Sequence, residues 1–284
     1  MNNREKQFIY EIEAGNSYRP TVHARSPWSE TMQHGGPVMG LFGREVEKAA
    51  DQTGMRVVRL TVDLLKAVPF EALVAETRFE REGSRIAAIV STLRPVNSDE
   101  PVARASGLLL RARQRDHPYR GNTEYPLPCP TGPEAPRPVV RDKPPTFFHE
   151  QLDSIHGVDD AGRYVWARMK QDLVAGEATS PFQKAAAMMD VIYGWGARME
   201  VARIRALTPG KHAMLALSIN VDSTSYWERP FTGEWLGMRP SVISQQDGIA
   251  LVSSVLYDEV GRVGTSTASA LNQDDFKGRS ASSR

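Results

Sequence analysis

The chain has 284 residues, 40% of them hydrophobic, which is enough to bury one large core or two ordinary ones. Its 35 Lys and Arg residues balance 34 Asp and Glu residues, so no global field draws it to nucleic acid or to an anionic membrane surface. A single cysteine excludes an internal disulfide, no stretch is apolar enough to span a membrane, and the polar first residues are unlike a secretion signal. We therefore expect a cytoplasmic protein.

The first predicted element is an amphipathic helix within residues 31–51. Apolar residues recur there at helical spacing, and charged residues occupy the other side. Gly35-Gly36-Pro37 stands at its start, where proline is tolerated because the first helical turn leaves its N–H groups without partners. The apolar residues are Val38, Leu41, Phe42 and Val46.

Four runs rich in β-branched residues follow this helix, and Pro, Gly or Asn-Ser-Asp turn signals separate them. They cover residues 56–65, 73–81, 86–94 and 102–110. Short connections predict a meandering antiparallel sheet. Residues 1–126 are thus predicted to form a first domain of one helix and one sheet.

A proline-rich segment, residues 127–146, divides the chain nearly in half. Proline can neither donate to a sheet ladder nor continue a helix, so we interpret the segment as an extended connector. The last residues, 272–284, are polar and rich in Ser, Gly and charge, and we expect them to form a disordered tail.

The same order of elements returns in residues 147–271. A strand is predicted at 164–169, a helix opens at Ser180-Pro181 and runs past Arg198, and strands follow at 214–223, 235–242, 249–257 and 263–271. Val68-Pro69-Phe70 in the first half matches Arg229-Pro230-Phe231 in the second. A period of half the chain length indicates a duplicated domain, whose two copies we expect to pair around an approximate two-fold axis.

Several short motifs occur along this series of helices and strands. They are His34-Gly35-Gly36 at the first helix, Val62-Asp63-Leu64, Asp190 in the second helix, Tyr226-Trp227-Glu228-Arg229-Pro230-Phe231, Glu234-Trp235-Leu236, and Leu256-Tyr257-Asp258 with Gly261 and Ser266-Thr267. With this set the sequence resembles the double hot-dog acyl-CoA thioesterases of the bacterial thioesterase II type, over nearly all of residues 27–271. The resemblance implies an α+β tandem (double) hot-dog, each half a curled antiparallel sheet around a long central helix.

Asp190 is the most informative residue of the second helix. Its helical neighbours are Ala186, Ala187, Tyr193 and Gly194, so the carboxylate is set among small and apolar residues. Burial without partners would be costly, so Asp190 either accepts a structural hydrogen bond or belongs to a functional site. The resemblance implies that it orients the water that hydrolyses a thioester.

The start of the first helix offers unpaired N–H groups and a positive dipole end to a carbonyl oxygen that becomes anionic. We predict His34, Gly35 and Gly36 as substrate-binding residues, with the Gly36 N–H at the oxyanion, because Pro37 has no N–H. A glycine turn chosen for conformation, with His34 as a cap, is the alternative. The resemblance implies one composite site, in which this helix start faces Asp190; Gly43 stands where the second helix carries Asp.

The resemblance places two further water-orienting positions at Asn220 and Ser269, where the family usually has a threonine or serine and a glutamine. Asparagine can donate and accept, and serine can hold a water. Three functions stay open: hydrolysis of acyl-CoA-type thioesters by an Asp-oriented water, another reaction (lyase, isomerase or cyclase) on a hydrophobic acyl or polyketide-like substrate, or binding of acyl ligands without catalysis.

Other site chemistry is not indicated. A Gly-x-Ser-x-Gly elbow is absent, Cys129 lies in the connector, and the histidines lack metal-ligand spacing, so we predict no covalent nucleophile, no metal and no cofactor. The expected partner is a small acyl thioester carried by coenzyme A or an acyl carrier, with no nucleic acid and with homo-oligomerisation left open. Arg111-Ala-Arg-Gln-Arg is interpreted as a solvated strand end, and contact with coenzyme A phosphates is the second interpretation.

Overall fold

The computed structural model describes residues 7–13, 15–113, 127–130, 147–191, 194–195 and 218–272. The first half contains β1 (Phe8–Ile12), β2 (Ser17–Pro20), the 3-10 turn η1 (Val22–Ala24), α1 (Gly35–Thr53), β3 (Arg56–Leu64), β4 (Leu73–Glu82), β5 (Ile86–Pro95) and β6 (Ala103–Leu110). The second half contains η2 (Phe148–Gln151), β7 (Asp153–Asp159), β8 (Gly162–Arg168), β9 (Asp172–Val174), α2 (Pro181–Met188), β10 (Ser218–Asn220), β11 (Asp222–Trp227), β12 (Trp235–Gln246), β13 (Ile249–Asp258) and β14 (Gly261–Asn272).

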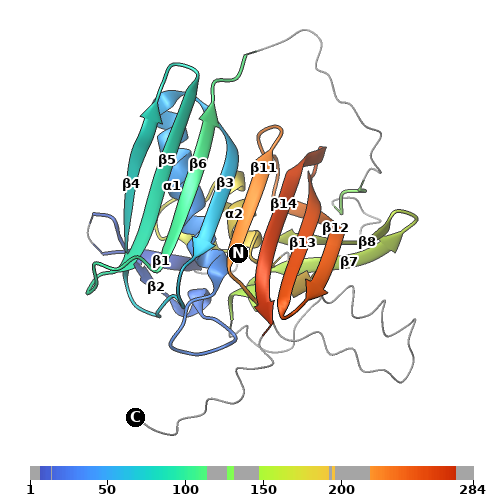
Figure 1. Cartoon of the computed structure of the whole chain (residues 1–284), viewed down its shortest axis with the longest axis horizontal. Coiled ribbons are helices and arrows are strands. Elements are labelled where there is room, and N and C mark those ends of the chain that lie inside the picture. The colour runs from blue at the N-terminus through green and yellow to red at the C-terminus, as the bar shows by residue number, and fades with distance from the viewer. Residues whose placement is uncertain are drawn as a thin grey trace, which may run out of the picture.

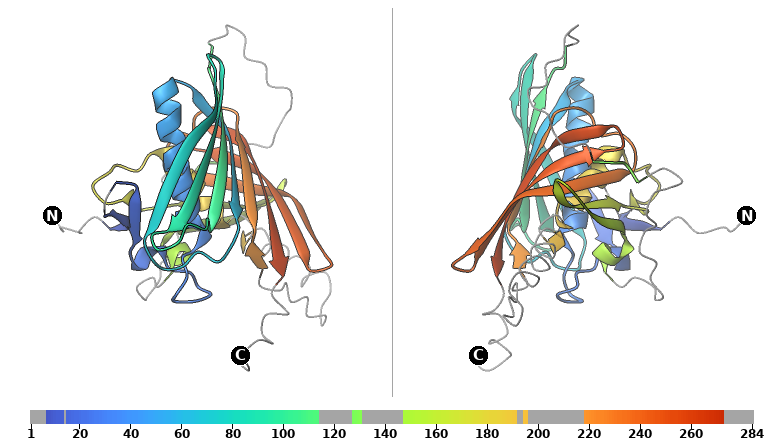
Figure 2. Two further views of the ribbon diagram at one scale, coloured as in Figure 1. Left: turned by 60° about the vertical axis from the view of Figure 1, so that its left-hand side comes forward. Right: turned by 90° about the vertical axis from the view of Figure 1, so that its right-hand side faces the viewer.

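The strands form one 14-stranded sheet, in the order β7-β8-β12-β13-β14-β11-β3-β6-β5-β4-β2-β1-β9, with β10 paired to β14. Both helices lie against the same face of this sheet (Figures 1 and 2). The predicted first helix and its four-strand meander are confirmed, with small shifts of the bounds. The sequence patterns did not indicate β1, β2, β7 or β9, which are short or lie at the ends of the sheet order.

The first helix begins later than the predicted residue 31. Met32 and Gln33 form isolated β-bridges with Pro69 and Arg25, so the chain is still extended there. His34 then takes the N-cap position with φ −73° and ψ 144°, and the helix starts at Gly35. Backbone pairing across the molecule therefore overrides the helical periodicity of residues 31–34.

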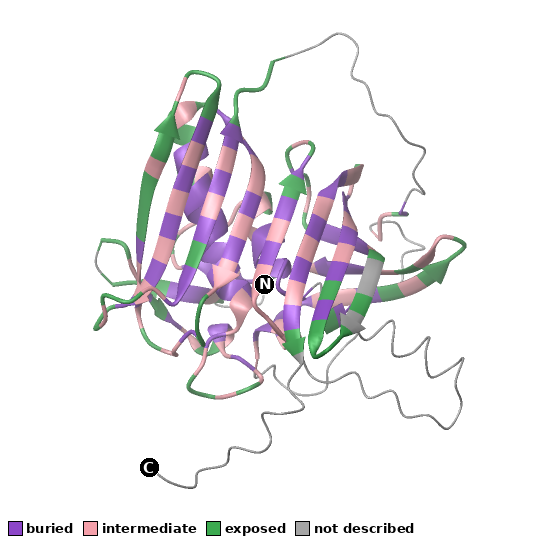
Figure 3. Cartoon of the chain, viewed as in Figure 1, coloured by how far each residue is buried: buried purple, intermediate pink, exposed green. Residues whose placement is uncertain are grey.

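The core lies between the sheet and the two helices. Along β5, Ala87, Ile89, Ser91 and Leu93 are buried and alternate with residues that are only partly buried, and Figure 3 shows this alternation as bands across the sheet. The α1 helix is covered on several sides, with Val38, Leu41, Phe42 and Val46 buried. Burial of each such side chain contributes roughly 1.5–3 kcal/mol, so the helix is fixed mainly by its apolar contacts. Within the described residues, no helix is both long and apolar enough to cross a membrane.

A strand pair joins the two halves of the chain. β3 and β11 pair antiparallel, with Leu60 opposite Ser225 and Val62 opposite Ser223. The predicted connector also contacts the second half, because Leu127 is buried beside Trp166, Trp235 and Tyr257. Most of the predicted connector, residues 131–146, and nearly all of the predicted tail, from residue 273, lie outside the described residues.

Small residues allow the two helices to pack closely. A Cβ atom added to Gly43 would lie 2.7 Å from the Cβ of Ala186, and one added to Gly40 would lie 3.1 Å from the Cβ of Ala187. Real Cβ atoms are not found at the shorter of these distances, so glycine is required where α1 crosses α2.

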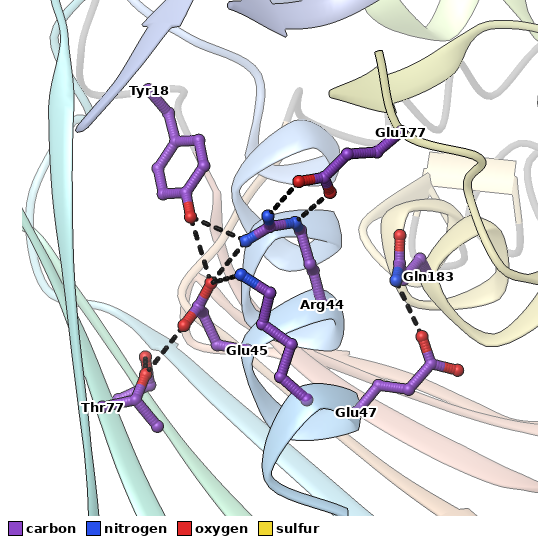
Figure 4. Close-up of polar contacts among 9 residues, drawn as sticks. Tyr18, Arg44, Glu45, Glu47, Thr77, Glu177 and Gln183 are labelled. Carbon is purple, nitrogen blue, oxygen red and sulfur yellow. Dashed lines mark hydrogen bonds and ion pairs between the residues drawn. The ribbon is translucent and has the colours of Figure 1, made fainter. Parts of the chain in front are cut away.

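A polar cluster at the far end of the helix pair also ties the halves together (Figure 4). The Arg44 side chain, 4% exposed, donates from Nε to Glu177 at 2.7 Å and from Nη1 to the Tyr18 hydroxyl at 2.7 Å and to Glu45 at 2.9 Å. Burial opposes the charge, but the hydrogen bond to Glu177 and the negative charges of the groups around the guanidinium together outweigh it and raise the pKa of Arg44. The same bond lowers the pKa of Glu177, so this pair stays ionised at neutral pH.

Glu47 belongs to the same end of α1 and supports the start of α2. Its Oε1 accepts a hydrogen bond of 2.8 Å from the Ser180 hydroxyl. Its Oε2 accepts one of 2.7 Å from the Gln183 amide, which Figure 4 shows. Ser180 in turn caps α2 by accepting from the backbone N–H of Gln183. The N-terminus of α2 is thus held by side chains from both halves.

The helix contact generates a first prediction. Gly43→Ala should lower the free energy of unfolding by about 1–3 kcal/mol, the usual cost of overpacking, although alanine is the better helix former. Chemical denaturation measures the change. Ala186→Gly removes the opposing methyl group, so adding it to Gly43→Ala should recover part of the loss; a double variant that shows only the sum of the two single losses would contradict the packing argument.

Candidate active site

The start of α1 is fixed by contacts that surround His34. The backbone N–H groups of Gln33 and His34 donate to the carbonyls of Val68 and Ala24, both at 2.8 Å. The Gln33 side chain donates to the carbonyl of Pro69, also at 2.8 Å. These bonds hold the cap residue in one position, with its side chain only 10% exposed.

Asp190 lies directly after α2, and the prediction that it lies inside the helix is therefore wrong. α2 ends at Met188, and Met189 and Asp190 form a turn before the helical Val191. The physical reason is visible at the backbone: the Asn220 side-chain amide donates to the Asp190 carbonyl, and the N–H of Met189 donates to Ala186 in a tightened turn. The Asn220 side chain from β10 thus occupies the Asp190 carbonyl, which in a regular helix would accept a hydrogen bond from a backbone N–H of the next turn.

The Asp190 side chain, 9% exposed, meets donors from both halves of the chain. Its Oδ2 lies 2.9 Å from Nδ1 of His34, and its Oδ1 accepts a hydrogen bond of 2.8 Å from the Asn220 amide. The carboxylate also rests on Gly35, where an added Cβ would lie 2.7 Å from Oδ1 and 2.8 Å from Oδ2. The fold therefore brings together Asp190, Asn220 and the His34-Gly35-Gly36 segment.

Nδ1 of His34 lies between the cap of α1 and the carboxylate. It accepts a hydrogen bond of 3.0 Å from the backbone N–H of Gly36, and it lies 2.9 Å from Oδ2 of Asp190. The Gly36 N–H also lies against the carboxylate, and that contact helps to lower the pKa of Asp190.

Asp190 is ionised despite its burial. Removal from water raises the pKa of the carboxyl group, but the charge of His34, the hydrogen bonds from His34 and Asn220, and the Gly36 amide together bring it below its ordinary value. The site at neutral pH is therefore a buried carboxylate with several donors around it.

Family models match most of the chain. The model of the acyl-CoA thioesterase N-terminal domain matches residues 24–110, and the model of the C-terminal domain matches residues 127–271. The chain belongs to the acyl-CoA thioesterase family. Its activity is acyl-CoA thioester hydrolysis.

Solved structures show the same fold at low identity. A tesB protein of Mycobacterium avium subsp. paratuberculosis is 14% identical, with a TM-score of 0.63 over 92% of this chain and 94% of that one. An acyl-CoA thioesterase II of Mycobacterium marinum is 16% identical, with a TM-score of 0.58 over 97% and 96%. A hot-dog protein of Alicyclobacillus acidocaldarius is 16% identical, with a TM-score of 0.59 over 92% and 94%. No curated protein matches the sequence.

Ser269 is not brought to the Asp190 centre of this thioesterase. Its neighbours Ala268 and Ala270 are buried on the inner face of β14, and alternation along the strand turns Ser269 to the other face. There its N–H donates to Asp222 at 2.9 Å, and its hydroxyl donates to the same oxygen. Asn220 pairs with Ala270 and so lies on the inner face with the site.

Aromatic rings that were not predicted from the sequence form a wall of the site. The ring centroid of Phe148 lies 5.2 Å from that of His34, and the ring of His149 lies 5.7 Å from it. Both residues belong to η2, a single short turn after the connector, and no periodic pattern marks it. The adjacent pair Phe147-Phe148 after a proline-rich run was the only available signal.

Arg111 lies at the opposite end of α1 from the site. Its guanidinium donates to the carbonyls of Ser84 and Thr53, both at 2.7 Å, and so caps the last turn of the 19-residue helix. A helix of that length spans about 28 Å at 1.5 Å per residue. We therefore interpret Arg111 as an anchor of the helix end, and not as a contact for coenzyme A bound at Asp190.

The lowered pKa of Asp190 gives a stability prediction. A carboxyl group whose pKa is lower in the folded state stabilises the fold above its unfolded pKa, about 4, and this contribution disappears as the pH falls through the folded value. Unfolding free energies of the unmodified protein and of Asp190→Asn should therefore converge as the pH drops below about 4. Denaturant titrations between neutral pH and pH 2 measure the difference; a gap that stays constant or widens in acid would contradict the assignment.

Proposed function

We propose that this thioesterase hydrolyses acyl-CoA by direct attack of a water molecule held beside Asp190 and Asn220. The observation that carries the proposal is a buried, ionised carboxylate surrounded by donors from both halves at a glycine-led helix start. A charge in such a place is expensive to maintain, and it gives a water molecule a fixed acceptor out of bulk solvent.

The Asn220 side chain provides a second contact to the water, in addition to that of Asp190. Its Nδ2 donates to Asp190, while its Oδ1 is buried without a hydrogen-bond partner. A buried acceptor of this kind costs roughly 1–3 kcal/mol unless a donor reaches it. One O–H of the water can supply that donor while the other faces the catalytic base.

We assign the oxyanion contact to Gly35, one residue before the Gly36 that the sequence predicted. The Gly36 N–H is directed at His34 and Asp190 and so is occupied. Gly35 precedes it at the first helical position, where the N–H groups point away from the helix and have no intrahelical acceptor. We assign the developing negative charge of the thioester oxygen to the Gly35 amide and to the positive end of α1.

The same proposal includes the tandem arrangement of the fold. The halves share the order of a helix followed by long antiparallel strands, and they meet through β3 and β11 and through the glycine-lined helix contact. This supports two hot-dog units in one chain, each sheet curling around its own helix, with the site formed where the units meet.

Asp190→Asn tests the central residue. The change keeps the size of the side chain and removes its charge, so thiol release from acyl-CoA should fall by about 10²–10⁴-fold while the fold stays intact. Release of free thiol across a series of acyl chain lengths measures it. Asp222→Asn is the matched control, because this carboxylate binds Ser269 on the outer face, and its turnover should stay unchanged. Unaltered turnover in Asp190→Asn would rule the mechanism out.

Asn220 and Ser269 give a second comparison. Asn220→Ala removes a donor to Asp190 and an acceptor for the water, so we expect kcat to fall at least tenfold, as for other groups that position a reactant. Ser269→Ala should leave kcat near that of the unmodified protein, because its hydroxyl is turned to Asp222. Equal losses in the two variants would show that both side chains reach the water.

A further inference from the structure

We infer that the acyl group hydrolysed at this site carries a hydroxyl or carbonyl group along its chain, which buried serine side chains of the second half recognise. The inference deepens the proposed function and rests on it, since it names the substrate class of the same hydrolysis. It assigns Ser223, Ser254 and Ser266 as the residues that select the acyl group.

Within the described residues of the second half, the buried serines lie on the inner face of neighbouring strands. Ser266 of β14 lies opposite Ser225 of β11 on one side and opposite Ser254 of β13 on the other, so these side chains form a row across three strands (Figure 1). Ser223 stands two residues from Ser225, on the same face of β11. All of them are at most 3% exposed. Polar side chains thus stand where the interior of a sheet usually has apolar ones.

The protein satisfies one of these hydroxyls and leaves the others without a partner. The Ser225 hydroxyl accepts from the Trp227 indole at 3.0 Å and donates to the Leu60 carbonyl at 3.3 Å. Three hydroxyls are buried with no hydrogen-bond partner in the part of the chain that the structure describes: those of Ser223, Ser254 and Ser266. A buried hydroxyl without a partner costs free energy, and three in one patch are best explained by a ligand that brings its own polar group.

The α2 helix crosses this serine face and ends at the proposed reacting centre. The Phe182 ring in its first turn lies 5.4 Å from the ring of Trp227 on β11. Asp190, directly after its last turn, accepts from Asn220 on β10. Ala185 is buried one turn after Phe182 on the same side of the helix, so the helix presents a small side chain toward the serines.

The serines follow the reacting centre in order along the sheet. Asn220 pairs with Ala270 on β14, and Ser266 stands four residues from Ala270, roughly 13 Å away at about 3.3 Å per residue. Ser223, three residues after Asn220 in the chain, lies between these two points. An acyl chain that starts beside Asn220 and runs beneath α2 therefore meets Ser223 first and the pair of Ser254 and Ser266 farther on.

The group that these serines recognise is neutral. A serine hydroxyl can both donate and accept, so it binds a hydroxyl or a carbonyl oxygen equally well. A charged group on the acyl chain would need an opposite charge to offset its removal from water, and the serine row is uncharged. A saturated alkyl chain would cover the three hydroxyls and leave them unpaired, so the site discriminates against it.

Matched pairs of acyl-CoA esters test the inference. The two esters of a pair have one chain length and differ by a single hydroxyl or keto group, which is placed at successive carbons in successive pairs. We expect kcat/KM to favour the oxygenated ester by about tenfold or more at the carbons that reach the serines, because a saturated chain leaves these hydroxyls unpaired. An oxygenated ester that is no better than its saturated counterpart at every carbon would overturn the inference.

Ser254→Ala and Ser266→Ala identify the groups responsible. Each should lower kcat/KM for the favoured oxygenated ester by about tenfold and leave that for the saturated ester unchanged or higher, because the alanine methyl group is apolar. The midpoint of thermal unfolding should not fall, because the hydroxyl removed has no partner in the described part of the protein. Ser253→Ala is the matched control: its hydroxyl bonds Thr267 at 2.9 Å on the outer face, so the preference should stay unchanged.

Ordered water is the alternative occupant of this face. In that case the alanine variants would lose thermal stability and slow both esters of a pair equally, and this result would overturn the inference. A preference that survives in the double variant Ser254→Ala/Ser266→Ala would also overturn it. If the unmodified protein releases no thiol from any ester, the proposed function is rejected, and binding then decides the inference. Oxygenated esters should raise the midpoint of thermal unfolding more than their saturated counterparts, and an equal rise would contradict it.

Discussion

A buried carboxylate at the junction of the two halves constrains much of this molecule. Removing Asp190 from water costs several kcal/mol unless donors replace the water, and those donors come from the α1 cap and from β10. The carboxylate can reach them only because Gly35 has no side chain in its path. The burial of Asp190 therefore depends on three features together: the close approach of α1 and α2, the turn that ends α2, and the donors in the site.

The two ends of the helix pair use buried charge differently. At the far end, Arg44 is saturated by Glu177, Glu45 and the Tyr18 hydroxyl, and Glu47 binds the start of α2. At the near end, the Asn220 Oδ1 is buried without a hydrogen-bond partner. The polar contacts at the far end join the two halves of the chain, and the proposed function assigns the chemistry to the near end.

Much of the fold could be predicted from the sequence because hydrophobic periodicity and turn residues mark the first helix and the long strands. Resemblance brought Asp190 and the His34-Gly35-Gly36 segment to one site, and their contacts agree with it. The direction of Ser269 could not be predicted, since a small irregularity near β10 and β11 decides which face each residue takes. The contact between Phe148 and His34 could not be predicted either, because it depends on distances between segments far apart in the chain.

A crystal structure with a non-hydrolysable thioether analogue of acyl-CoA tests the central claim most directly. The account predicts that the carbon equivalent to the thioester carbonyl lies between the Gly35 amide and an ordered water, and that this water contacts Asp190 and Asn220. An analogue bound away from the start of α1, or an Asp190 side chain turned into open solvent in the complex, would contradict it.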